Sequence, residues 1–171
     1  RARKDTSAAF RETVMQEPSV LDVCENYRGK VKAWYTATTS NDEKQTSITD
    51  KLQMDQWIRI CDENALCGQW ECYRESDITG DPACKTLYKW RLSNAQVRFC
   101  FMDSQPTEQL GAGQSSGEDA QATLDFEEFF ECCARCGCDM YRAVKEMDPA
   151  HKCKGFIENL LGLSTPDEIV T

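Results

Sequence analysis

The chain is 171 residues long, and 40% of its residues are hydrophobic and 29% charged, with a formal net charge of −9. Its length and apolar content fit one ordinary globular domain or two small ones and exclude a disordered polyampholyte. The acidic excess lies mainly in residues 92–171 and would repel phosphate backbones, so we expect no nucleic-acid partner. No apolar run reaches the roughly 18 residues that a membrane span needs, so we expect no membrane insertion.

The first half of the chain contains two predicted helices, which form a helix–loop–helix unit over residues 18–64. Residues 1–17 are weakly patterned and predict an N-terminal arm with some helix. Pro18 can begin a helix, and apolar side chains at helical spacing carry it to about residue 37. A polar loop and a second helix at about 53–64 follow. Residues 65–91 contain glycine, aspartate and proline breakers and predict a connection without long strands.

The second half contains a second predicted unit, over residues 92–147, and a C-terminal helix with a tail, over 148–171. Ser93 begins the first helix of this unit in a capping box that the glutamine three residues later completes. A low-complexity stretch over 104–123 predicts an exposed, mobile insert. Asp125 caps the next helix, which is predicted to run to about Val144. We therefore predict an all-α fold.

Eleven cysteines make the chain cysteine-rich, and the odd number means that they cannot all pair with one another. We expect mostly free thiols and a reducing intracellular compartment such as the cytoplasm or the cytoskeleton. The segment from Cys61 to Cys84 has room for one disulfide or none. A zinc site is an alternative, with His151 or Cys153 completing a set drawn from the clustered thiols of Cys132, Cys133, Cys136 and Cys138.

The segment LDFEEFFECC, residues 124–133, carries the most specific pattern in the chain. A calcium-binding EF-hand loop ends with an aliphatic residue at position 8 and a bidentate glutamate at position 12. Leu124, Asp125, Phe126 and Glu128 match positions 8, 9, 10 and 12. If Asp103 is position 1, the loop is about 14 residues longer than a normal one.

The segment LQMDQWIRIC, residues 52–61, repeats this pattern, with Leu52 matching Leu124 and Gln56 matching Glu128. Over residues 20–145 the chain thus resembles a degenerate, calmodulin-like pair of EF-hands with distended loops. Such over-long pairs occur as modules of protist cytoskeletal and flagellar proteins. The resemblance implies no calcium in the first loop, because Gln56 replaces the glutamate. In the second loop it implies Asp103, Asp125 and Glu128 as the ligands of any calcium.

The same resemblance implies an apolar cleft between the two units, of the kind that grips an amphipathic helix. Six aromatic residues are predicted to build this core and cleft: Trp34, Trp57, Phe99, Phe126, Phe129 and Phe130. We expect the C-terminal helix to occupy the chain's own cleft through Phe156 and Leu160.

The sequence offers little catalytic chemistry. Its one histidine, His151, lies in a polar helix start and is expected to face solvent. No nucleophile elbow, P-loop or dinucleotide fingerprint is present. We therefore expect no enzyme and no cofactor, but a non-catalytic protein-binding or structural module, a subunit or docking domain of a larger assembly of cytoskeletal or ciliary type. The alternatives are a calcium sensor with one functional site in the second loop and a zinc-binding cysteine module.

Overall fold

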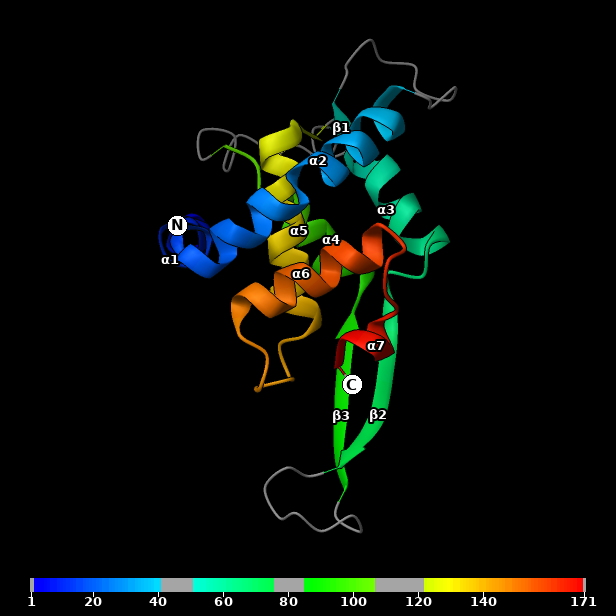
Figure 1. Ribbon diagram of the computed structural model, residues 1–171. Helices are drawn as coiled ribbons and strands as arrows, with labels where there is room; N and C mark the ends of the chain where they lie inside the picture. Colours follow the sequence, from blue (N-terminus) through cyan, green and yellow to red (C-terminus); the bar gives the residue numbers. More distant parts are fainter. Residues whose placement is uncertain (1, 41–50, 76–84, 107–121, 171) are drawn as a thin grey trace.

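The computed structural model describes residues 2–40, 51–75, 85–106 and 122–170 (Figure 1). The described chain is mostly helical and contains two small antiparallel sheets. Its helices are α1 (Ala2–Thr13), a 3-10 turn (Val14–Gln16), α2 (Pro18–Ser40), α3 (Met54–Glu63), α4 (Asn94–Asp103), α5 (Phe126–Met140), α6 (Pro149–Leu160) and α7 (Pro166–Val170). The strands are β1 (Leu52–Gln53), β2 (Gly68–Glu75), β3 (Lys85–Leu92) and β4 (Thr123–Leu124). Among the described residues, no helix has the length and apolar character to cross a bilayer.

The predicted helix starts are confirmed. The Ser93 hydroxyl accepts a hydrogen bond from the Gln96 backbone N–H at 3.1 Å, and the Gln96 side chain accepts one from the Ser93 N–H at 2.8 Å. The Asp125 carboxylate accepts from the Glu128 N–H at 2.9 Å and so caps α5. These bonds satisfy backbone donors that the first turn of a helix leaves without partners.

The all-α prediction is wrong for residues 65–91, where the structure has a β-hairpin. Strands β2 and β3 pair from Gly68↔Leu92 to Glu75↔Lys85. Along β3, Tyr88 and Trp90 alternate with charged residues, which is the period-two pattern of a sheet, and Trp70 of β2 pairs with Trp90 on one face. The predicted breakers Gly80, Asp81 and Pro82 lie outside the described residues. In Figure 1 the hairpin projects from the helical body, and α7 lies beside it.

Two helix boundaries also differ from prediction. Helix α2 continues to Ser40, and α5 ends at Met140 rather than near Val144. Tyr141, the residue that follows α5, is fully buried, and its hydroxyl donates a hydrogen bond to the Asn159 side chain on α6 at 2.6 Å. Most of the predicted insert at 104–123 lies outside the described residues, as do residues 41–50 of the first loop.

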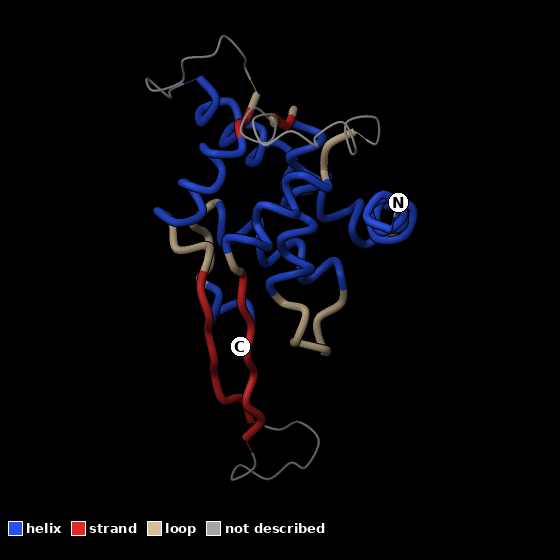
Figure 2. Tube along the Cα trace, turned by 180° about the vertical axis from the view of Figure 1, so that it is seen from behind, coloured by secondary structure: helices blue, strands red, loops and turns tan. Residues whose placement is uncertain are grey.

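The core lies around α5, which packs against α6, α4, α2 and the base of the hairpin. Its buried side chains include Phe129 and Met140, and α6 adds Phe156 and Ile157. Figure 2 shows the two strands of the short β1–β4 pair lying together at the end of the helical body opposite the hairpin. This pair joins the two halves of the chain and positions the candidate site.

Candidate functional site: the paired loops

The two helix–loop–helix units meet at the strand pair β1–β4. Leu52 and Leu124, which the sequence pattern aligns with each other, are direct antiparallel partners, and both are fully buried. The Tyr35 hydroxyl, from α2, donates to the Leu124 carbonyl at 2.7 Å and accepts from the Leu52 N–H at 3.3 Å. One side chain of the first unit therefore holds both loops.

Behind the strand pair, residues at matching positions of the two units contact each other. Trp57 and Phe129 lie five residues after their paired leucines, and their rings meet edge to face with centroids 5.3 Å apart. Trp34 stacks on Phe129 at 5.3 Å, and Phe156 of α6 meets Trp57 at 6.3 Å. Such aromatic pairs contribute about 0.5–1.5 kcal/mol each beyond their burial. The two units therefore share one aromatic core.

The structure brings most of the predicted cleft residues together. Trp34, Trp57, Phe129 and Phe156 form one contact group, while Phe126 contacts Phe130 and Tyr35. Leu160 is buried in the same core. The prediction that Phe99 lies in the core is wrong, since its side chain is 52% exposed. Helix α4 turns Val97, Cys100 and Phe101 inward, and this leaves Phe99 on the opposite side.

The first loop is closed by a direct hydrogen bond between its two flanking helices. Gln56 is buried on α3, and its amide donates to the Thr38 carbonyl near the end of α2 at 3.1 Å. This glutamine occupies the position that the EF-hand pattern gives to the bidentate glutamate. A neutral amide therefore joins the two ends of the loop.

In the second loop, Asp125 and Glu128 interact with each other at the start of α5. Burial, a hydrogen bond with Asp125 and the Asp125 charge raise the pKa of Glu128 to about 7. Burial also acts to raise the pKa of Asp125, but hydrogen bonds from Glu128 and the nearby Lys51 charge outweigh burial and lower it. These shifts favour a protonated Glu128 beside an ionised Asp125.

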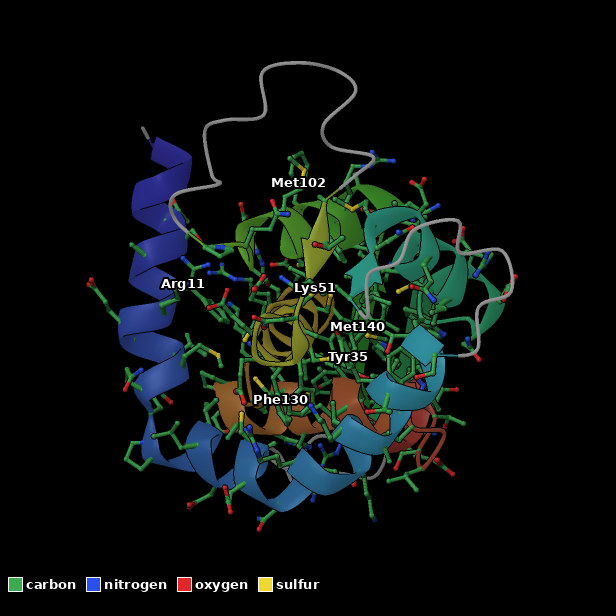
Figure 3. The ribbon with its side chains drawn as sticks, turned by 90° about the horizontal axis from the view of Figure 1, so that it is seen from above. Arg11, Tyr35, Lys51, Met102, Phe130 and Met140 are labelled. Carbon is green, nitrogen blue, oxygen red and sulfur yellow. The ribbon has the colours of Figure 1, made fainter. Side chains whose placement is uncertain are left out.

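The beginning of the second loop is held by α1. The Asp103 carbonyl, at the end of α4, accepts hydrogen bonds from the Ser7 hydroxyl at 2.8 Å and from the Arg11 guanidinium at 2.9 Å. Arg11 also donates to the Gln105 carbonyl at 2.6 Å. Figure 3 shows Arg11 on α1, on the side that faces α4 and α5. A cation at this place complements the negative end of the α4 dipole.

Arg11 belongs to a partly buried ion network on α5. Its guanidinium contacts the Glu131 carboxylate at 2.7 Å, and Arg135 contacts the same carboxylate at 3.2 Å. Arg135 is buried, donates to the Ser7 carbonyl at 3.0 Å, and lies 4.3 Å from the centre of the Phe10 ring. The sequence pattern missed this network because residues 1–17 carry no clear periodicity and their partners lie some 90 to 130 positions away.

The predicted metal ligands do not form a complete cation site. Asp125 and Glu128 lie together, whereas Asp103 contributes its backbone carbonyl to Ser7 and Arg11. In the part of the chain that the structure describes, no three histidine, cysteine, aspartate or glutamate side chains converge as metal ligands would. The proposed zinc set is therefore not assembled among these residues, and His151 is exposed.

Comparisons with known proteins identify no relative. No family model, no curated protein and no solved structure matches the chain. What the chain does is therefore inferred from its own residues.

Proposed function

We propose that the chain is a non-catalytic protein-binding or structural module, a subunit or docking domain of a larger assembly of cytoskeletal or ciliary type. It is built on a pair of degenerate EF-hand-like units. The observation that carries the proposal is the direct pairing of Leu52 with Leu124. Each leucine follows a helix and a long loop, and precedes a helix, so the pairing joins two units of the same order.

The way in which the loops are held supports a structural role over calcium sensing. Gln56 joins the ends of the first loop, and Arg11 supplies a fixed positive charge at the start of the second. A sensor changes shape because an ion changes the contacts of its loops. Here protein groups make contacts of that kind permanently, so the pair is held in one state.

The partner surface we propose is the outer face of the hairpin. The shared core is filled by the chain's own α6, through Phe156 and Leu160. By contrast, Tyr73 and Leu87 are cross-strand partners that are 66% and 38% exposed. An exposed aromatic–aliphatic pair on a projecting element suits the centre of a protein interface, where aromatic residues are enriched.

The proposal is tested by fractionating ciliated cells that express the tagged chain. We expect the wild-type chain in the detergent-insoluble cytoskeletal fraction and the double variant Tyr73→Glu/Leu87→Glu in the soluble fraction. Leu163→Glu is the matched control. Leu163 is likewise an exposed apolar residue, with 52% of its surface accessible, but it lies outside the hairpin. Recovery of the wild-type chain in the soluble fraction would overturn the assembly role, and a double variant that stays insoluble would overturn the surface.

A calcium sensor is the second candidate, and the observation that favours it is that Asp125 and Glu128 lie together at the start of α5. Two carboxyl groups held this close would gain from a divalent cation. Native mass spectrometry with calcium and then with a chelator separates the candidates. We expect the bare protein in both conditions. A single calcium adduct that the chelator removes, and that Glu128→Gln abolishes, would replace the structural proposal with the sensor.

A further inference from the structure

The cysteines of the structure are free thiols, yet several of them lie in contacting pairs. Ten of the eleven cysteines are among the described residues. Three pairs of thiols lie close enough to shift each other's pKa: Cys138 with Cys153, Cys61 with Cys67, and Cys100 with Cys136. The Cys138–Cys153 pair differs from the others because it links α5 to α6, the two helices that pack most closely in the fold.

The backbones of α5 and α6 touch where this pair lies. A Cβ added to Gly137 would lie 3.1 Å from the Cys153 Cα and 2.4 Å from the Lys152 carbonyl oxygen. The Cys153 Sγ lies 3.7 Å from the Ala134 carbonyl oxygen, one helical turn before Cys138. A helical side chain points back over the preceding turn, so the Cys138 side chain is directed to the same place.

The two thiols of this pair differ in access and in acidity. Cys153 is fully buried, whereas Cys138 is partly exposed. The hydrogen bond from Cys153 lowers the pKa of Cys138, and the charges of Lys152 and Arg142 act in the same direction, against burial and Asp139. The hydrogen bond to Cys138 and burial raise the pKa of Cys153. A partly exposed thiol of lowered pKa beside a buried thiol is an arrangement that favours thiol–disulfide exchange.

We propose that Cys138 and Cys153 form a thiol-modification site, which low-molecular-mass disulfides of the glutathione type oxidise to an intramolecular disulfide between α5 and α6. The Cys138 thiolate attacks one sulfur of the oxidant, a mixed disulfide forms, and one glutathione thiolate leaves. Cys153 then loses its proton and attacks the Cys138 sulfur, and the second glutathione thiolate leaves. Two protein thiols and one glutathione disulfide thus give one protein disulfide and two glutathione thiols.

Neither of the other contacting pairs combines an accessible thiol with a link between two helices. Cys100 and Cys136 are both buried, so an external disulfide cannot reach either sulfur. Cys67 is partly exposed, and its hydrogen bond with Cys61 lowers its pKa. However, Cys61 and Cys67 flank a single turn at the end of α3. A bond between them would close a much shorter loop than one between Cys138 and Cys153, and disulfide stabilisation grows with loop length.

The test uses the full chain, reduced and then exchanged into a glutathione disulfide buffer, with remaining thiols alkylated before peptide mapping. We expect a peptide that links Cys138 to Cys153, and an intact mass lower by two hydrogen atoms for this bond. The melting temperature of the oxidised chain should exceed that of the reduced chain by about 6–12 °C, because the bond closes a loop of about 15 residues. Alkylation of both thiols after oxidation, or a link from Cys138 to another cysteine, would overturn the proposal.

Three variants identify the attacking sulfur. Cys153→Ser should stop at a mixed disulfide with one glutathione on Cys138, and Cys138→Ser should leave Cys153 reduced. Cys72→Ser is the control, since Cys72 lies on the hairpin and the variant should form the Cys138–Cys153 bond at the wild-type rate. If Cys153→Ser does not fold, the wild-type peptide map still decides whether Cys138 and Cys153 are linked. Glutathione on Cys153 in Cys138→Ser would contradict the assigned order of attack.

Discussion

Replacement of Gly137 by alanine tests the contact between α5 and α6 directly. The new Cβ would lie 2.4 Å from the Lys152 carbonyl oxygen and 2.9 Å from its carbonyl carbon. Carbon and oxygen atoms rarely approach closer than about 3.3 Å, so α6 must move by about 1 Å. The opposing atoms belong to the backbone and cannot rotate away. That movement would loosen Phe156 and Ile157, which α6 buries in the core.

Two opposing terms set the magnitude. Overpacking of a close contact costs about 1–3 kcal/mol and sometimes more. Alanine recovers up to about 1 kcal/mol of helix propensity relative to glycine. We therefore expect Gly137→Ala to lower the free energy of unfolding by about 2 kcal/mol. Gly29→Ala is the matched control, because Gly29 is also helical and nothing lies within 4 Å of its added Cβ. It should raise the free energy of unfolding by about 0.5–1 kcal/mol.

Urea unfolding of both variants and the wild type, under reducing conditions and followed by tryptophan emission and far-UV circular dichroism, measures this difference. The two variants should differ by about 3 kcal/mol. Equal stability of Gly137→Ala and Gly29→Ala would refute the close approach of the two helices. It would also remove the geometric basis of the Cys138–Cys153 pair.

Three further predictions concern the paired loops. Because the pKa of Glu128 is raised from 4.5 to about 7, the folded state binds its proton more tightly, so wild-type stability should fall as pH rises between these values. The urea midpoint of Glu128→Gln should not fall with pH in this way. If it does fall, the decline belongs to a titrating group other than Glu128. Arg11→Ala should cost about 1–2 kcal/mol and increase hydrogen exchange in α1, whereas exposed Arg28→Ala should change exchange little. Phe129→Ala should cost about 3–5 kcal/mol and reduce near-UV circular dichroism; a loss below 1 kcal/mol would contradict its central place in the core.

Local chemistry made much of the helical fold predictable. Helix caps such as Ser93 and Asp125 depend on residues three positions apart, so a sequence window contains both partners. The hairpin is not predicted because one of its faces carries charged pairs such as Glu71 with Lys89, which interrupt the apolar pattern of a strand. Glycine and proline between the strands predict a loop. These residues occur both in irregular connections and in hairpin turns, so they do not distinguish the two.

The candidate site was predictable only in part, because sequence spacing reveals repeated positions but not contacts made by tertiary packing. The repeat of leucine and aromatic positions in the two halves pointed to Leu52 and Leu124, which the structure pairs. No spacing rule connects Arg11 with Asp103, because that contact arises from tertiary packing across 92 residues. The EF-hand resemblance predicts Phe99 in the core, but the direction of its side chain depends on which face of α4 meets α5.

The Tyr35 hydroxyl has a consequence for how the chain folds. One oxygen atom serves both the Leu52 N–H and the Leu124 carbonyl, so neither bond can be lost by a shift of α2 without weakening the other. Each such bond contributes about 0.5–1.5 kcal/mol, and burial makes a broken one costly. Both halves therefore depend on the same hydroxyl. The two halves are separate segments of the chain, yet they should fold and unfold as one cooperative unit with a single transition.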